Sequence, residues 1–371
     1  MSNTLDATAL LADANVHRLL VQATLVSVTG DLFQPAGFPD IGHVIYDAPR
    51  KDGTKEKVCV VDSAASMANH LEAVSLASAQ TLELHPDLEG MPYLECLTDA
   101  PGTTGGTSPT RLVVTSLSEG HRLASSYFLD EKGKVVDDGA VSADNFATVL
   151  RTSFGIQDLG KKTHPLPADW WNVFLTIFRY DPNSLVHGIL FPAMGIKLSR
   201  VLTAHHEAFG ADRVGLSGVK FDKLGKTTSG QPIFSVDKES AREIRATFVI
   251  DLSLLRSFGR GEHGLNINQK RFLFELALWK IGRLLSGPYR FRSGCDLKLA
   301  ALARIENGSS TELAPTELQR DIMTAIQSAG FSEPRVTQVY WPSDELFKTG
   351  KDDDKAQHGA GEESESEETS D

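Results

Sequence analysis

The sequence predicts an α+β fold in which helices cover one antiparallel sheet. Short segments rich in branched apolar residues, which are typical of strands, alternate with longer segments whose apolar residues recur every three or four positions, which is typical of helices. Turn signals such as Asp52-Gly53 join neighbouring strand segments and favour hairpins, hence antiparallel pairing. With 371 residues, 41% of them hydrophobic, the chain is long enough to bury a large core.

The first third of the chain predicts a strand, a hairpin and a helix, in that order. We expect the strand over residues 19–28, where branched apolar residues dominate, and the hairpin over residues 44–61. Asp62 or Ser63 can then cap a helix. The apolar side chains of this helix recur at steps of three or four and share one face: Met67, Leu71, Val74 and Ala77.

The middle of the chain predicts a strand over residues 111–116, a helix over 142–154 and a buried apolar segment over 170–180. Residues 197–209 predict an amphipathic helix with one basic side. Residues 210–240 are polar and rich in glycine, and short alternating runs interrupt them. That pattern favours an exposed β-hairpin that projects from the body.

The last third predicts a strand over residues 245–254, a helix over 269–285 that is apolar on nearly every face, and a helix over 315–327 that begins with proline. A final strand is expected over residues 335–341. We therefore expect residues 1–343 to form a single domain with insertions.

The net charge of −12 is concentrated at the end of the chain. Residues 352–371 hold nine acids against one lysine, a net of −8, which leaves −4 on the rest. Residues 344–371 are acidic, rich in Ser and Glu and poor in aromatic residues, which predicts a disordered tail. Residues 270–298, in contrast, hold seven bases against two acids and are a candidate phosphate-facing surface.

Several classes of protein are not supported. The first residues lack the layout of a signal peptide and no apolar stretch is long enough to span a membrane, so we expect a cytoplasmic protein without a membrane partner. Cys59, Cys96 and Cys295 form neither a disulfide framework nor a zinc knuckle. His205 and His206 are adjacent on a predicted helix and would diverge instead of sharing a metal. No motif for a nucleophile, a metal or a nucleotide cofactor occurs, so we expect no enzyme and no cofactor.

Two segments carry candidate binding chemistry. Residues 62–69 place free backbone N–H groups, hydroxyls and small side chains at a helix N-terminus, which suits an anion, although ordinary helix capping explains the same residues. Arg290-Phe291-Arg292 alternates bases about an aromatic ring, as a sheet edge that faces RNA would, although solvated surface charge is an open alternative.

Separated stretches resemble the backbone subunit of type I-G (formerly type I-U) CRISPR Cascade, a member of the Cas seven family of RAMP proteins. They lie in the expected order between about residues 20 and 298: Phe33-Gln34-Pro35-Ala36-Gly37-Phe38-Pro39-Asp40, Ser66-Met67-Ala68-Asn69-His70-Leu71-Glu72, His121-Arg122-Leu123-Ala124-Ser125, Asp181-Pro182-Asn183-Ser184-Leu185-Val186-His187-Gly188, Ser217-Gly218-Val219-Lys220, and Ala277-Leu278-Trp279-Lys280 through Arg290-Phe291-Arg292-Ser293-Gly294-Cys295-Asp296-Leu297.

The resemblance implies an RRM-like (ferredoxin-like) palm with inserted finger and thumb elements, the thumb being residues 210–240. It also implies that copies of the chain stack in a helical filament along the crRNA, whose bases pair with target DNA. The other partners it implies are the remaining Cascade subunits, a large subunit and an RNA-processing subunit of the Cas five or Cas six type. The implied role is binding and preorganisation of the guide without bond cleavage.

The resemblance and the clustered bases together assign contacts with RNA. The predicted RNA-binding residues are Gln34, Ser63, Ser66, Met67, Asn69, His121, Arg122, Asn183, His187, Arg200, Lys220, Lys280, Arg283, Arg290 and Arg292. No catalytic and no metal-binding residue is expected.

Two alternatives belong to other classes. Related backbone subunits of type III complexes cut bound RNA with a loop aspartate, for which Asp40 or Asp47 would be the candidate here. The chain could also be a protein-interaction scaffold in which the acidic tail makes the contacts.

Overall fold

The computed structural model describes residues 5–38, 42–99, 111–157, 165–215 and 238–347. Its largest sheet has eight strands in the order β21-β22-β1-β18-β15-β6-β5, with β23 beside β22, and every pair in it is antiparallel. The strands are β1 (Arg18–Ser27), β5 (Ile45–Pro49), β6 (Lys55–Asp62), β15 (Leu202–Phe209), β18 (Glu243–Asp251), β21 (Tyr289–Arg292), β22 (Cys295–Glu306) and β23 (Ser309–Glu312).

Four strands and two helices of this layer make an RRM-like core. The chain runs from β1 through α2 (Ala64–Ala73) to β15 and β18, and then through α8 (Ile267–Ser286) to β22. This is the β-α-β-β-α-β order of a ferredoxin-like fold, and β22, β1, β18 and β15 are consecutive neighbours in the sheet. The α+β fold class and its antiparallel sheet are confirmed.

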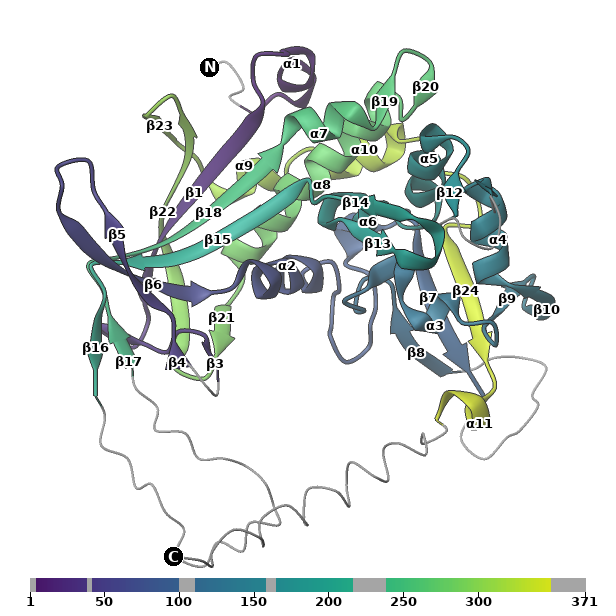
Figure 1. Ribbon diagram of the computed structural model, residues 1–371, viewed down its shortest axis with the longest axis horizontal. Coiled ribbons are helices and arrows are strands. Elements are labelled where there is room, and N and C mark those ends of the chain that lie inside the picture. The colour runs from purple at the N-terminus through teal and green to yellow at the C-terminus, as the bar shows by residue number, and fades with distance from the viewer. Residues whose placement is uncertain (1–4, 39–41, 100–110, 158–164, 216–237, 348–371) are drawn as a thin grey trace, which may run out of the picture.

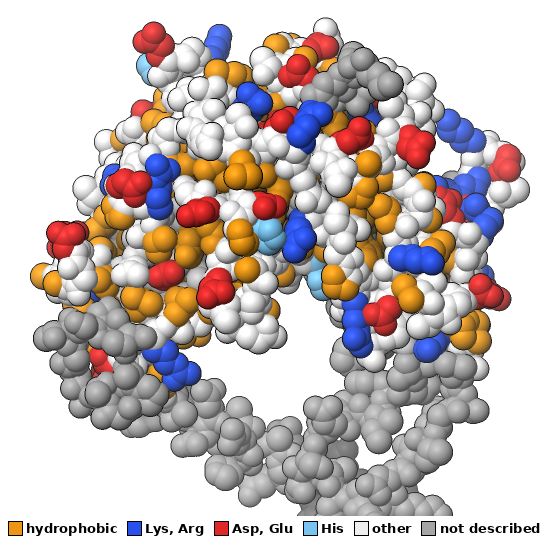
Figure 2. Space-filling view, turned by 180° about the vertical axis from the view of Figure 1, so that it is seen from behind, with side chains coloured by type: hydrophobic (Ala, Val, Ile, Leu, Met, Phe, Trp, Pro, Cys, Tyr) orange, Lys and Arg blue, Asp and Glu red, His pale blue; other side chains and the backbone are white. Residues whose placement is uncertain are grey.

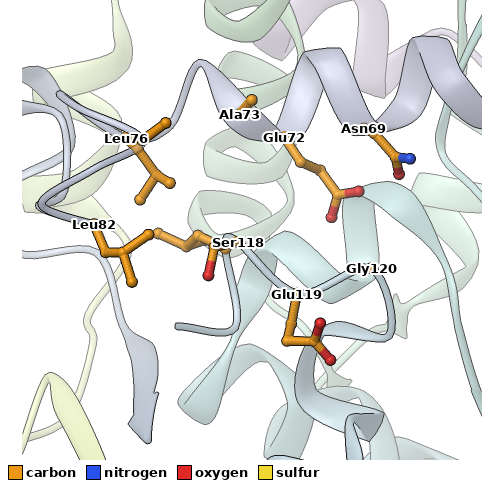
Figure 3. A pocket seen from close by; sticks show the side chains of 10 residues that line it. Asn69, Glu72, Ala73, Leu76, Leu82, Ser118, Glu119 and Gly120 are labelled. Carbon is orange, nitrogen blue, oxygen red and sulfur yellow. The ribbon is translucent and has the colours of Figure 1, made fainter. Parts of the chain in front are cut away.

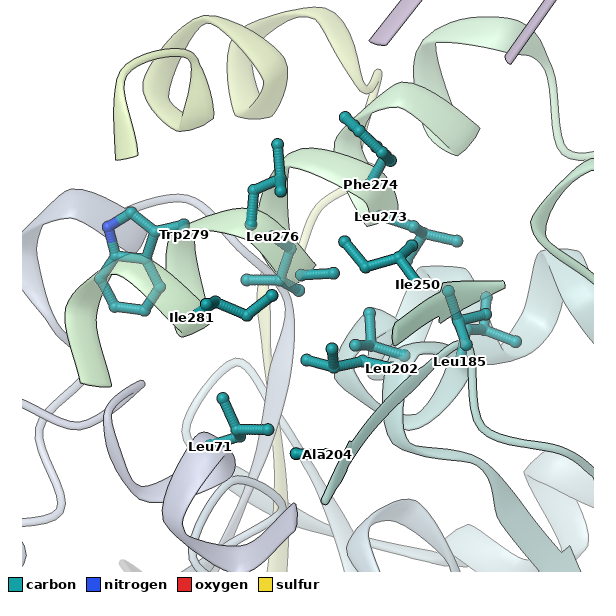
Figure 4. Packing of buried hydrophobic residues seen from close by; sticks show 14 of the residues in the cluster. Leu71, Leu185, Leu202, Ala204, Ile250, Leu273, Phe274, Leu276, Trp279 and Ile281 are labelled. Carbon is teal, nitrogen blue, oxygen red and sulfur yellow. The ribbon is translucent and has the colours of Figure 1, made fainter. Parts of the chain in front are cut away.

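Alternation of side chains explains why the sheet has one covered face. Along β1, every second residue is buried, among them Val21 and Ala23, whereas Gln22 and Thr24 on the other face are half-buried. The helix α8 packs on the covered face and is buried nearly all round, with Asn266 and Gln269 forming a capping box at its start. Figure 4 shows side chains of α8, α2 and the sheet interdigitating in this core.

A second sheet was not anticipated from the sequence. It has the order β10-β9-β24-β7-β8, in which β24 runs parallel to β7 and the other pairs are antiparallel. Its strands are β7 (Tyr93–Thr98), β8 (Arg111–Thr115), β9 (Lys134–Asp137), β10 (Ala140–Asn145) and β24 (Val336–Trp341). In Figure 1 the helix α2 lies between the eight-stranded sheet on the left and this sheet on the right.

The remaining elements are short. The helices are α1 (Ala7–Ala12), α3 (Ser126–Leu129), α4 (Phe146–Ser153), α5 (Trp170–Tyr180), α6 (Pro182–His187), α7 (Leu252–Ser257), α9 (Pro315–Gln319), α10 (Ile322–Ser328) and α11 (Ser343–Leu346), with 3-10 turns η1 (Pro86–Leu88), η2 (Arg122–Ala124) and η3 (Pro192–Met194). The strands are β2 (Leu32–Phe33), β3 (Gly37–Phe38), β4 (Gly42–His43), β11 (Ile156–Gln157), β12 (Leu166–Pro167), β13 (Ile189–Phe191), β14 (Ile196–Leu198), β16 (Asp212–Val214), β17 (Lys238–Ser240), β19 (Gly259–Arg260) and β20 (His263–Gly264).

The helix predicted over residues 197–209 is wrong, because this segment forms β14 and β15. β15 pairs with β18 on one side and β6 on the other, so its backbone groups are satisfied within the sheet. The apolar spacing of Leu198, Val201 and Leu202 fits a helix as well as a strand, and tertiary pairing decides between them. His206 is consequently buried, and His205 is exposed on the opposite face.

Other boundaries shift by a few residues. The helix predicted over 142–154 begins only at Phe146, because β10 precedes it and Asn145 caps it. The strand predicted over 245–254 ends at Asp251, which caps α7. The helix predicted over 315–327 is two short helices, α9 and α10. The hairpin before α2 and the last strand are confirmed.

The projection predicted over residues 210–240 is described only at its base. There β16 and β17 pair antiparallel, as in a hairpin, while residues 216–237, including Lys220, lie outside the described residues. Of the predicted tail, residues 348–371 also lie outside them, and α11 occupies the beginning of that segment. Among the described residues, no helix is long and apolar enough to cross a membrane.

Candidate nucleic-acid interface

The helix α2 begins where β6 ends. Asp62 is the last residue of the strand, and the Ser63 hydroxyl caps the helix by accepting a hydrogen bond from the Ser66 N–H at 3.1 Å. The Ser63 carbonyl accepts from the Met67 N–H at 2.8 Å. The capping interpretation of this segment is therefore confirmed, and contact with an anion stays a prediction.

The outward face of α2 carries small side chains. Ala64, Ala65, Asn69 and Ala73 are exposed and Ser66 is half-exposed. Met67, predicted to touch RNA, points the other way and is completely buried in the core. A face of this kind lets the backbone of a nucleic-acid strand approach the helix closely, because no long side chain keeps it away.

One side of α2 borders a cavity of about 250 Å³, which we call the arginine pocket. It lies between α2, the C-terminal end of α8 and β21, and both Arg283 and Arg290 line it with exposed side chains. Arg290 is paired with Asp296 at 3.2 Å, an exposed ion pair that water and a phosphate can compete for. The other residues that line the arginine pocket are His70, Ala73, Val74, Leu76, Leu284, Gly287, Pro288, Tyr289 and Phe291.

Arg292 does not face the pocket as its neighbour Arg290 does. The pairing of β21 with β22 shifts register between these two residues, so the strand does not simply alternate there. The Arg292 guanidinium donates to Asp62 Oδ1 at 2.6 Å and to the carbonyl oxygens of Val61 and Gln34 at 3.0 and 3.2 Å. It therefore fixes the end of β6, from which α2 starts, and is mostly buried.

Gln34 belongs to the same hydrogen-bonded network as Arg292. Its backbone N–H donates to the Gly294 carbonyl at 2.8 Å, and its side-chain nitrogen lies 3.0 Å from His43 Nε2. The other ring nitrogen of His43 lies 3.0 Å from Glu239 Oε1, a completely buried carboxylate. Gln34 thus connects β21 and β22 to the base of the projection at β17.

His70 is not among the residues predicted from the sequence, although it lies one turn after Ser66 on the same helix. Its ring packs edge-on against Phe291 at a centroid distance of 4.6 Å, and its Nε2 lies 3.7 Å from Asp62 Oδ2. Burial lowers the pKa of His70 below its ordinary value, Asp62 opposes that shift and Arg292 adds to it. Behind it, burial lowers the pKa of His206 to about 3, so that histidine is neutral.

Three side chains predicted to bind RNA, those of Arg122, Asn183 and Lys280, lie beneath α2 and not on its outward face. Glu72 accepts hydrogen bonds from Arg122 Nη2 at 2.7 Å and Asn183 Nδ2 at 3.2 Å, and all three side chains are buried. The Lys280 ammonium donates to Ser75 Oγ at 2.6 Å and to the Leu71 carbonyl at 3.1 Å. These contacts tie α2 to η2, α6 and α8.

Burial decides what these residues can do. Lys280, Asn183 and His187 expose at most 1% of their surface, so none of them reaches a strand that lies on α2. Burial, with the charges of Lys280, Arg122 and Arg200, lowers the pKa of His187 well below its ordinary value. We therefore leave Met67, Arg122, Asn183, His187 and Lys280 out of the interface and assign them to its support.

The other side of α2 borders a cavity of about 400 Å³, which we call the acidic pocket. Figure 3 shows Asn69 and Glu72 of α2 facing Ser118 and Glu119 across it. Two carboxylates in its lining disfavour a phosphate there. His121 is exposed one residue beyond this lining.

Arg200 is half-buried and reaches the first turn of α2, where its Nη1 donates to the Ala64 carbonyl at 3.3 Å. The structure thus gathers Ser63, Ser66, Asn69 and Arg200 on or beside α2, with Arg283 and Arg290 on its flank.

The surface of the molecule is indented at its lower edge in Figure 2, between the parts that contain the two sheets. No group of three or more His, Cys, Asp or Glu side chains that could hold a metal occurs in the part of the chain that the structure describes.

No curated protein matches the chain. The model of one family, described as CRISPR-associated protein GSU0053, matches residues 19–213, which is more than half of the chain. The match begins in β1 and ends in β16, so it includes α2, η2 and β15. The chain therefore belongs to this CRISPR-associated family, and its role lies in CRISPR defence.

Proposed function

We propose that the chain is a non-catalytic backbone subunit of a type I CRISPR surveillance complex, of the I-G subtype and the Cas seven family. Several copies bind the spacer part of the crRNA by its sugar-phosphate backbone and leave the bases free to pair with target DNA. Membership in a CRISPR-associated family and the RRM-like core support this proposal.

One observation carries the proposal: the small outward face of α2 lies directly beside a pocket that two exposed arginines line. A phosphate on the flank of α2 would meet Arg283 and Arg290, while the alanines of the helix allow the ribose to pass. Both arginines come from the segment whose local charge is positive in a chain of net charge −12.

Such contacts predict affinity that depends on salt and hardly on base sequence, because phosphates are read and bases are not. Binding of the full chain to single-stranded oligoribonucleotides of unrelated sequences is measured across a salt series. For Arg283→Glu combined with Arg290→Glu, we expect weaker binding and a salt slope that is smaller by roughly one to two units.

Arg18→Glu is the matched control. Arg18 and Arg290 have similar exposure, 57% and 61%, and each is paired with an aspartate, at 3.3 and 3.2 Å. Arg18 starts β1, whereas the other end of β1 lies next to the β21–β22 hairpin, so the control is remote from the arginine pocket. If the double variant binds like the wild type while both proteins are folded, this interface is wrong.

A further inference from the structure

His70 stands at the wall of the arginine pocket with two cations. It projects from α2, Arg283 from α8 and Arg290 from β21, and all three line the same cavity of about 250 Å³. An anion held by the two arginines would therefore lie beside the imidazole.

The charged and titratable groups around His70 come from four elements. Asp62 faces it from β6, Tyr289, Arg290 and Arg292 from β21, Arg283 from α8, and the neutral His206 from β15. Arg292 is engaged by Asp62 Oδ1, whereas Asp62 Oδ2 is buried and accepts no hydrogen bond from any residue that the structure describes. This free oxygen lies 3.7 Å from His70 Nε2, so it is placed to pair with the imidazole once the imidazole carries a proton.

Without a ligand, the surroundings of His70 favour its neutral form. Burial and Arg292 both hold its pKa below the ordinary value, and Asp62 only opposes them in part. A phosphodiester drawn in by Arg283 and Arg290 adds a negative charge that neighbours the ring and favours its charged form. The same imidazolium then has Asp62 on one side and the phosphate on the other.

We propose that the arginine pocket takes up one phosphodiester of the RNA together with one proton, which His70 accepts on binding. The inference rests on the proposed function, since it assumes that the chain binds RNA. It adds a third cation to the contact and makes the affinity depend on pH.

The sign follows from linkage. The pKa of His70 is low in the free protein and higher in the complex, so the complex binds more protons between the two values. Affinity therefore rises as pH falls through that window and levels off below the pKa of the free protein. One coupled proton allows at most about tenfold in affinity per pH unit.

The test measures binding of the full chain to one oligoribonucleotide at fixed salt between about pH 8 and about pH 5. We expect affinity to increase several-fold toward low pH for the wild type and to be nearly flat for His70→Gln. His70→Lys carries a permanent cation. It is expected to bind RNA more tightly than the wild type at about pH 8, and its affinity is expected to be independent of pH as well. His205→Gln, on the uncovered face of the sheet, should retain the wild-type pH dependence.

Calorimetry in two buffers of different ionisation enthalpy supplies an independent readout, the number of protons taken up on binding. The wild type should take up a larger fraction of a proton than His70→Gln near neutral pH. If RNA binds but wild type and His70→Gln share one pH profile and one proton count, the inference is overturned and the proposed function stands. If RNA does not bind at any pH, both are overturned.

Discussion

Buried charges hold α2 in place from below. The Arg122 guanidinium is buried, pairs with both carboxylate oxygens of Glu72 and donates to the Gly188 carbonyl at 3.0 Å. Asn183 supplies a further hydrogen bond to the same carboxylate. Because each buried charge has its partners, the network is tolerated in the core, and it joins three elements, α2, η2 and α6, at one carboxylate.

Removing one partner should therefore cost more than an ordinary ion pair. Arg122→Ala leaves the Glu72 carboxylate buried and without its counter-ion, and we expect it to lower the free energy of unfolding by about 3–5 kcal/mol. Urea unfolding measures this. Arg18→Ala, which breaks an exposed pair, should change stability by less than about 1 kcal/mol. Equal effects of the two changes would contradict the role given to Glu72.

Lys280 predicts a pH dependence of stability. Burial, the largest cause, lowers its pKa from 10.5 to about 8 in the folded protein, while the unfolded chain retains the ordinary value. Between these two values the unfolded state binds more protons at this group, so its contribution to stability rises with pH; below about pH 8 it is constant.

The comparison with Lys280→Met isolates this contribution. As pH rises from about 8 toward 10.5, the free energy of unfolding of the wild type should increase relative to that of the variant. Urea unfolding of both proteins at several pH values in that window measures the difference. A difference that does not change with pH would show that the pKa of Lys280 is not lowered in the folded protein, so that the lysine stays charged across the window.

At the scale of secondary-structure elements, the hydrophobic core depends on the helix α8. Leu276 is fully buried in the hydrophobic core, and Figure 4 shows it among other core side chains of α8. Leu276→Ala should lower the free energy of unfolding by about 2–5 kcal/mol, because it removes buried apolar contacts and leaves a cavity. Met323→Ala, at a side chain that is 60% exposed, should change it by less than about 0.5 kcal/mol. Thermal or urea unfolding distinguishes the two.

Elements with a clear local signal were predictable. The first strand, the hairpin before α2, α2 itself and α8 follow from apolar spacing and caps that the sequence displays. β15 was not predictable, because its apolar spacing also fits a helix and its partners lie far away in the chain. The second sheet was missed for the same reason, since β7 pairs with a strand more than two hundred residues later.

At the scale of the whole molecule, the candidate interface lies where separate parts meet. The exposed arginines of α8 and β21 could be predicted from local charge, and the structure brings them to α2. The burial of Lys280 and Arg122 could not be predicted from the sequence, because it depends on how α2, α6 and α8 pack together. The proximity of His70 to Asp62 could not be predicted either, because it depends on the direction in which α2 leaves the end of β6.

The place of β24 has a consequence for how the protein is made. This strand lies between β9 and β7 and is formed by residues near the end of the described chain. During synthesis on the ribosome, the pairs β9–β10 and β7–β8 emerge early but lack their shared neighbour until residues 336–341 have been translated. Nascent chains of this protein must therefore keep those strand edges from aggregating while the residues between β10 and β24 are translated.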